Sequence, residues 1–115
     1  MRALALGAVT ALVACGAPGP DARPAASSPV AGLSLVPAPG GLDVAGSGGR
    51  EIGFGRARDG ALATAARIAG RAPRPVPCGA GREGQSIGAD LVMVFTNGAF
   101  SGWQAPGRSA GTACT

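Results

Sequence analysis

The sequence predicts a small α+β domain, in which one antiparallel β-sheet of about four to five strands carries a single helix packed on one face. Two observations support this fold class. Runs with strand character surround the one stretch that has helical periodicity. An Asn-Gly pair, Asn97-Gly98, separates two apolar runs near the end of the chain. With 21 Gly and 10 Pro among 115 residues, the hydrophobic core is expected to be small.

Three short segments in the first half of this domain are predicted strands. Residues 33–36 alternate polar and apolar side chains and stop before a proline. Residues 42–44 and 51–55 flank a glycine-rich turn, which predicts a β-hairpin. Ile52 and Phe54 are expected on the same face of that hairpin, because side chains alternate along a strand.

Residues 59–69 are predicted to form the helix. Asp59 is a suitable N-cap, and Gly70 can end the helix in the left-handed conformation. Apolar residues recur at helical spacing and form one stripe: Leu62, Ala65, Ala66 and Ala69. Because the stripe is mostly alanine, the helix can approach a sheet closely. Residues 72–90 are rich in Pro and Gly and are expected to be a loop.

The clearest strand signal is the pair of apolar runs 91–96 and 99–103. The Asn-Gly pair between them favours a type I′ turn, which would pair Phe95 with Phe100. With that register, one face carries Leu91, Met93, Phe95 and Phe100, and the other carries Val92, Val94, Ala99 and Trp103. The second face is a candidate binding surface, with Trp103, Val92 and Val94 as candidate partner contacts.

The N-terminus has the layout of a secretory signal. Arg2 precedes an apolar run, residues 3–13, that is shorter than the about 20 residues needed to cross a membrane. The run ends in Leu12-Val13-Ala14-Cys15, which resembles the lipobox of bacterial lipoproteins. The resemblance implies that the Cys15 thiol receives a diacylglycerol, that the chain is cut before Cys15, and that the lipid anchors it in the cell envelope. In that family an Asp after the cysteine favours the inner membrane, so Gly16 favours the outer membrane. An ordinary signal peptide with a chance cysteine is the alternative.

These features divide the chain into three parts. Residues 1–14 are the predicted signal peptide, residues 15–32 the lipidated cysteine and a tether, and residues 33–115 the α+β domain. The tether is predicted from its Pro, Ala and Ser content, and a flexible chain of this length reaches about 20–25 Å.

Two further cysteines, Cys78 and Cys114, lie in the domain. Because the signal would deliver the chain to an oxidising compartment, we expect them to form a disulfide. A bond closing a loop of this length stabilises a domain by about 3–4 kcal/mol in the chain-entropy description. Two free thiols are the alternative.

A second resemblance covers the run from Phe54-Gly55-Arg56 through residues 91–95 to Gly98-Ala99-Phe100-Ser101-Gly102-Trp103. This run resembles small uncharacterised bacterial envelope lipoproteins. It is also distantly similar to the helix-plus-sheet domains of outer-membrane assembly lipoproteins and of secreted inhibitor modules. The second likeness is one of fold, which does not imply function.

Two short motifs suggest enzymes but lack the required context. Residues 84–88 spell G-x-S-x-G around Ser86, but the chain contains no His to act as the general base. Residues 79–84 spell G-x-G-x-x-G, but a proline-rich segment precedes them instead of a strand. The carboxylates are scattered and no histidine ligand exists, so we expect no metal and no cofactor apart from the lipid on Cys15.

Basic residues gather in the middle of the chain. Between positions 56 and 82 there are six Arg and one Asp. Four of these arginines are candidate partner contacts: Arg56, Arg58, Arg67 and Arg71. Clustered guanidinium groups would suit anionic lipid head groups or an acidic protein. A solvated basic face with no partner is the alternative.

The sequence therefore predicts a lipid-anchored protein of the bacterial cell envelope that faces the periplasm. We expect a non-catalytic binding or scaffolding module whose partner is an envelope protein or an anionic surface. A nucleic-acid partner is disfavoured by the export signal. The alternatives are a small-ligand-binding protein, an enzyme that uses carboxylates or arginine, and a domain that folds only on binding.

Overall fold

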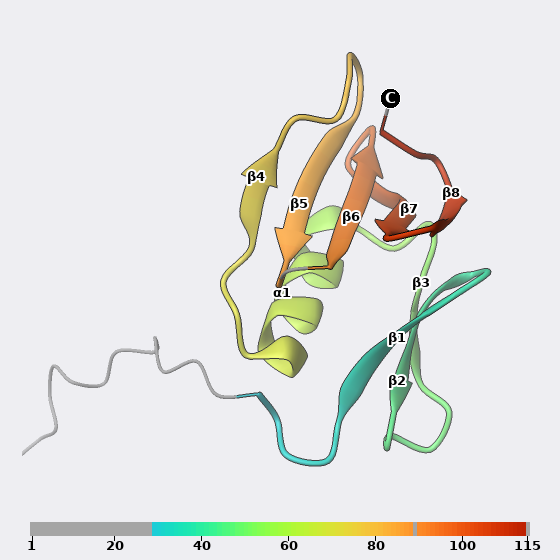
Figure 1. Cartoon of the computed structure of the whole chain (residues 1–115). Coiled ribbons are helices and arrows are strands. Elements are labelled where there is room, and N and C mark those ends of the chain that lie inside the picture. Colours follow the sequence, from blue (N-terminus) through green and yellow to red (C-terminus); the bar gives the residue numbers. More distant parts are fainter. Residues whose placement is uncertain (1–28, 89, 115) are drawn as a thin grey trace, which may run out of the picture.

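The computed structural model describes residues 29–88 and 90–114 as an α+β fold with two antiparallel sheets and one helix (Figure 1). Its elements are β1 (Ser34–Ala38), β2 (Gly41–Ala45), β3 (Glu51–Gly53), α1 (Arg58–Ala69), β4 (Arg74–Val76), β5 (Glu83–Ile87), β6 (Leu91–Thr96), β7 (Ala99–Ala105) and β8 (Arg108–Gly111). The predicted fold class is confirmed, but the prediction of a single sheet is wrong. The predicted signal peptide, Cys15 and the tether as far as residue 28 lie outside the described residues.

The smaller sheet has the order β1-β2-β3. The predicted hairpin is present between β2 and β3, and Leu42 pairs with Ile52 in its register. Strand β1 runs past the expected stop, through Pro37 to Ala38. Because β1 is an edge strand, it tolerates a proline that a central strand would exclude.

The larger sheet is a meander with the order β4-β5-β6-β7-β8. The predicted hairpin around Asn97-Gly98 is confirmed, with Phe95 opposite Phe100. Both turn residues have positive φ, 52° for Asn97 and 79° for Gly98, as a type I′ turn requires.

A β-bulge in this hairpin changes which face Trp103 occupies. The register shifts between Val94 and Phe95, so that Val94 pairs with Gly102 and Met93 with Trp103. Ser101 is therefore an additional residue in β7, and an extra residue moves the following side chains to the opposite face. The expectation that Trp103 shares a face with Val92 and Val94 is wrong.

The prediction of a loop over residues 72–90 is also wrong, because β4 and β5 lie within it. Strand β4 contains Pro75 and lies at the sheet edge, where proline is tolerated. Strand β5 has the weak strand sequence EGQSI, yet it lies between β4 and β6 and pairs along its whole length with β6. Pairing with an apolar neighbour here outweighs intrinsic propensity.

The helix begins without the predicted cap. Its N-cap is Ala57, which makes no side-chain cap bond, and Asp59 lies in the first turn. A tertiary backbone contact holds this end instead, because the Arg58 N–H donates to the Gly98 carbonyl at 2.8 Å. The other end is as predicted: Gly70 adopts the left-handed conformation and its N–H donates to the Ala66 carbonyl.

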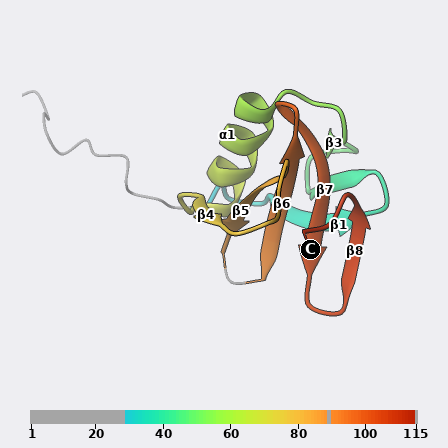
Figure 2. The ribbon, with the colours of Figure 1, turned by 90° about the horizontal axis from the view of Figure 1, so that it is seen from above.

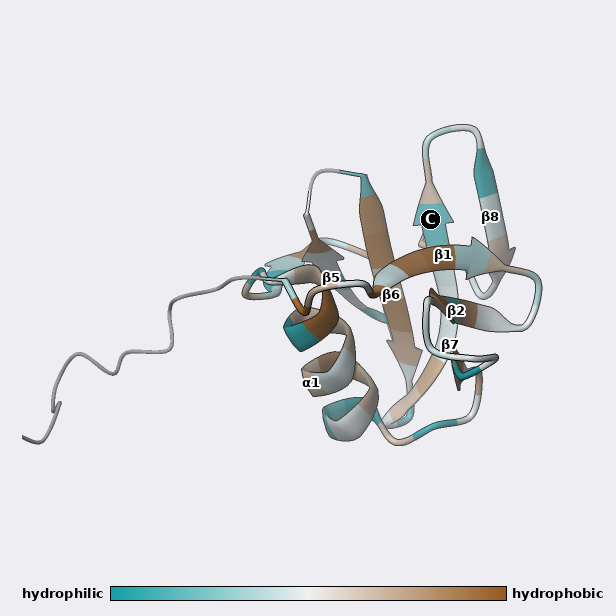
Figure 3. Cartoon of the chain, turned by 90° about the horizontal axis from the view of Figure 1, so that it is seen from below, coloured by the Kyte–Doolittle hydropathy of each residue, from teal (hydrophilic) through white to brown (hydrophobic). Residues whose placement is uncertain are grey.

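The core lies where the helix and both sheets meet, and Figure 2 shows α1 along one face of the larger sheet. The buried helix residues are Ala61, Leu62, Ala65 and Ile68, so the stripe is rotated from the predicted one. Its partners are chiefly Leu42, Ile52, Met93, Phe95, Phe100 and Trp103. In Figure 3 the hydrophobic colour runs along β6 and reappears on β1.

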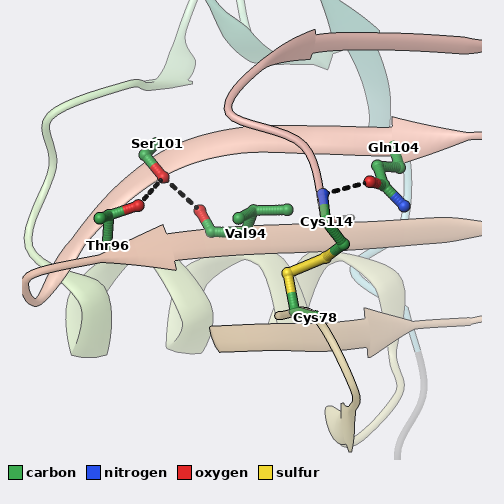
Figure 4. The surroundings of a disulfide bond; sticks show 6 residues. All are labelled: Cys78, Val94, Thr96, Ser101, Gln104 and Cys114. Atoms are coloured by element: carbon green, nitrogen blue, oxygen red, sulfur yellow. Dashed lines mark hydrogen bonds between the residues drawn. A yellow bond between two sulfur atoms is a disulfide. The ribbon is translucent and has the colours of Figure 1, made fainter. Parts of the chain in front are cut away.

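The opposite face of the larger sheet is covered by the predicted disulfide, which joins Cys78 to Cys114 (Figure 4). We call residues 112–114 the C-terminal strap. Val94 is 0% exposed and points away from the core. Its two cross-strand neighbours are Gly84 and Gly102. A Cβ at Gly84 would crowd Cys78, and one at Gly102 would overlap the strap backbone, so both glycines make room for this cover.

In the described part of the chain, no helix has the length and apolar character needed to span a membrane.

Candidate functional site

The candidate site is a cavity of about 470 Å³ between α1 and the hairpin formed by β2 and β3. We call it the arginine pocket. It is lined by Val30, Leu33, Val44, Ser47, Arg50, Glu51, Ile52, Arg56, Thr64, Arg67 and Ile68. Its volume lies within the range of about 300–1,000 Å³ that is usual for small-molecule sites.

Three arginines in the lining come from three different segments. Arg50 precedes β3 and is positioned by a closed turn, in which the Ser47 hydroxyl donates to the Val44 carbonyl at 2.6 Å and accepts the Arg50 N–H at 3.0 Å. Arg56 lies between β3 and α1, and its carbonyl accepts the Phe100 N–H at 2.9 Å. Arg67 is on α1, one helical turn from Thr64.

The positive charge of the pocket is not neutralised by the part of the chain that the structure describes. Arg50, Arg56 and Arg67 form no ion pair with any carboxylate among the described residues. Glu51 is the one acidic residue of the lining, so three positive charges face one negative charge. Guanidinium groups form strong paired hydrogen bonds with carboxylate and phosphate oxygens. The pocket is therefore suited to an anion.

The floor of the pocket is apolar. Ile52 and Ile68 belong to the core and are 1% and 6% exposed, so they close the bottom of the cavity. Leu33 and Val30 form a more exposed apolar rim, with Val30 36% exposed. The Val30 N–H donates to the Ile68 carbonyl at 3.4 Å. The first described residues therefore contact α1 at this rim.

The structure separates the arginines that the sequence grouped. Arg56 and Arg67 line the arginine pocket, whereas Arg71 lines a different cavity together with Arg74. Arg50, Glu51 and Thr64 also line the pocket and were not predicted. The pocket forms between elements that are distant in sequence, so no local pattern marks them.

The guanidinium of Arg58 is held in ion pairs within the domain. Its guanidinium makes a bidentate pair with Glu83, at 2.7 and 2.6 Å, and also contacts Asp59 at 2.6 Å. The hydrogen bonds from Arg58 hold the pKa of Glu83 below its ordinary value, and those with Glu83 and Asp59 raise the pKa of Arg58. Gln85 donates a further bond to Glu83 at 2.8 Å. This network ties the start of α1 to β5.

Two of the three predicted apolar contacts are buried. Trp103 is 3% exposed and its Nε1 donates to the Ala38 carbonyl at 2.7 Å, while Val94 is fully buried. Val92 is half-buried. These three side chains do not form the apolar patch that the sequence suggested, so we do not include them in the site.

Ser86 of the G-x-S-x-G motif lies within β5, where its hydroxyl donates to the Gly88 carbonyl at 2.9 Å. Across residues 29–88 and 90–114, no group of three His, Cys, Asp or Glu side chains is placed to hold a metal ion.

Comparison of the chain with protein-family models, with curated proteins and with solved structures found no match. Function is therefore inferred from the geometry of the arginine pocket and from the sequence.

Proposed function

We propose that the chain is a lipid-anchored, non-catalytic module of the bacterial cell envelope that binds an anionic partner in the arginine pocket. The observation that supports this most directly is that three arginines around one cavity, Arg50, Arg56 and Arg67, have no ion-pair partner among the described residues. Arginines that only solvate a surface are not expected to line one cavity from three separate segments of the chain.

The proposed anchor places the pocket near a membrane. If Cys15 carries the lipid, the predicted tether connects it to the described chain, and a tether of the length of residues 15–28 would reach about 20 Å. The described chain then begins at the rim of the pocket, beside Val30. A tether of this length lets the pocket approach the bilayer to within the Debye length of about 8–10 Å, over which an anionic surface attracts basic groups. We place the protein in the outer membrane, facing the periplasm.

The shape of the site favours one form of this function. A recessed cavity suits a small ligand or a lipid head group, whereas docking of a folded protein needs a broader contact surface. We therefore favour the ligand-binding form of the proposal over scaffolding of an envelope protein.

The anchor is tested with the variant Cys15→Ser. We expect the wild-type protein in the membrane fraction, labelled by a metabolic fatty-acid probe, and the variant unlabelled and in the soluble fraction. Cys114→Ser is the matched control, because it removes a cysteine from the domain and should leave labelling intact. Labelling and membrane association of Cys15→Ser equal to those of the wild type would refute the anchor.

The pocket is tested by sedimentation with vesicles. The mature chain without its lipid, residues 16–115, should bind phosphatidylglycerol vesicles and not phosphatidylcholine vesicles, with binding weakened by salt. Arg67→Gln should reduce binding, whereas Arg74→Gln removes the same charge outside the pocket and should have little effect. Equal losses in the two variants would show general charge attraction and would contradict a pocket-specific site.

A further inference from the structure

We infer that the arginine pocket binds one amphiphile, with an anionic phosphate or carboxylate head on the arginines and an aliphatic chain against the apolar lining. This inference rests on the proposed function, because it names the chemical class of the anionic partner. The same chemistry occurs in a free single-chain lipid and in a bilayer lipid.

The head-group end of the site follows from its charge. Three guanidinium groups can meet several oxygens of one phosphate or carboxylate, and Arg is suited to paired contacts of this kind. Thr64 adds a hydroxyl that forms no hydrogen bond with a described residue, and it lines the pocket next to Arg67 on α1. Glu51 leaves a net charge of about two positive units, which matches a single phosphate head.

The aliphatic end follows from the apolar lining and the volume. Five of the lining residues are apolar: Val30, Leu33, Val44, Ile52 and Ile68. A bare inorganic anion would use the arginines and leave the accessible apolar rim, Val30 and Leu33, in water. The cavity of about 470 Å³ also exceeds the space of such an ion, since one water occupies about 30 Å³ in the liquid. An aliphatic chain covers the rim at Val30 and Leu33 and removes apolar surface from water.

The position of the pocket supplies a route for such a ligand. Val30 and Leu33 stand at the rim where the described chain begins, so a lipid anchor upstream would hold this rim close to the source of acyl chains. A lipid from the adjoining leaflet, or a free single-chain lipid, would then enter at the apolar rim and meet the arginines.

The test measures affinity by calorimetry for the mature chain without its lipid, residues 16–115. Dodecyl phosphate, inorganic phosphate and dodecyl maltoside are compared, with the two dodecyl compounds kept below their micelle-forming concentrations. We expect dodecyl phosphate to bind at least about tenfold more tightly than either of the others, because only it satisfies both ends of the site. Competition with phosphatidylglycerol vesicles distinguishes the sources, and phosphatidylcholine vesicles control for partitioning of dodecyl phosphate into the bilayer. Displacement by phosphatidylglycerol beyond that by phosphatidylcholine identifies a bilayer lipid as a ligand, and equal displacement restricts the site to single-chain lipids.

Two variants test separately the contacts of the anionic head and of the aliphatic chain. Arg67→Gln should weaken dodecyl phosphate by about tenfold, as expected for one charge-assisted contact, while Arg74→Gln should not. Leu33→Ser should weaken dodecyl phosphate and leave inorganic phosphate unchanged, and its circular dichroism spectrum reports whether the fold is retained.

The outcomes distinguish this inference from the proposed function. If inorganic phosphate binds as tightly as dodecyl phosphate and both depend on Arg67, the inference of an amphiphilic ligand is refuted. The proposed function, binding of an anion, then stands. If dodecyl maltoside binds as tightly as dodecyl phosphate, the site is a general apolar one and the inference is refuted. If no anion binds, both the inference and the proposed function are refuted.

Discussion

The indole Nε1 of Trp103 donates a hydrogen bond of 2.7 Å to the carbonyl of Ala38, and this bond joins the two sheets. Trp103 lies in β7 and Ala38 ends β1, so the bond connects segments 65 positions apart. The bulge at Ser101 turns Trp103 into the core, and the Arg108 guanidinium lies 5.6 Å from the ring centre. A buried indole N–H normally has a partner, and here the partner is the neighbouring sheet.

Replacing Trp103 with Phe should destabilise the domain. The variant leaves the Ala38 carbonyl without its donor and a small void beside it, at a combined cost of about 2 kcal/mol. The unfolding free energy is measured by urea denaturation. Arg108→Gln is the control. It should cost less than about 1 kcal/mol of unfolding free energy, because an exposed cation over an aromatic ring contributes only about 0.5–1 kcal/mol. A Trp103→Phe variant as stable as the wild type would refute the link between the sheets.

The disulfide should stabilise the domain mainly through its unfolded state. Replacing Cys78 and Cys114 together with Ser should lower the unfolding free energy by about 3–4 kcal/mol. A reducing agent should lower the stability of the wild type and have no effect on the double variant. Equal stability of the oxidised and reduced wild type would contradict this account of the bond.

Two glycine-to-alanine substitutions should change the unfolding free energy in opposite directions. A Cβ at Gly102 would overlap the backbone of the C-terminal strap at Thr112, so Gly102→Ala should cost about 2 kcal/mol by overpacking. A Cβ at Gly60, on the exposed face of α1, meets nothing within 4 Å. Gly60→Ala should therefore stabilise the helix by about 0.5–1 kcal/mol. Thermal denaturation of both variants measures the difference, and a neutral Gly102→Ala would show that the strap does not press on the sheet.

The Arg58–Glu83 pair makes stability depend on acid pH. Arg58 lowers the pKa of Glu83 in the folded state, so the pair contributes fully above the unfolded pKa of about 4.5 and its contribution is lost as the pH falls through the lower, folded value. Because both side chains are about a third exposed, the contribution is below about 1 kcal/mol.

Glu83→Gln should flatten the pH dependence of the unfolding free energy below pH 4.5. Arg58→Gln should remove most of the same pH dependence, because Arg58 is the main cause of the lowered pKa of Glu83. The double variant should add little to Glu83→Gln, because the contact of Arg58 with the exposed Asp59 contributes little. Additive effects of the two single variants would contradict a shared pair.

Local signals predicted much of the fold. The Asn97-Gly98 turn and the helix end at Gly70 are set by backbone preferences of neighbouring residues, so they could be read from the sequence. Strands β5 and β8 have no such signal, since they form by pairing with strands already present. One extra residue, Ser101, was enough to misplace Trp103.

The candidate site could be predicted only in part. Arg56 and Arg67 were identified from the density of arginines, which is a property of composition. Arg50 lies in a glycine-rich turn, and its role depends on the packing of that turn against α1. Packing between distant elements is not encoded in any short pattern, so the cavity itself was not predictable.

Occupancy of the arginine pocket by an anionic amphiphile is observed residue by residue in a methyl and amide nuclear magnetic resonance titration. The mature chain without its lipid, residues 16–115, is titrated with dodecyl phosphate. We expect saturable shifts at Ile52, Thr64 and Ile68, which line the pocket, and no shift of the Trp103 indole N–H, which does not. Saturable shifts centred on Arg71 and Arg74, or shifts spread evenly without saturation, would contradict occupancy of the arginine pocket.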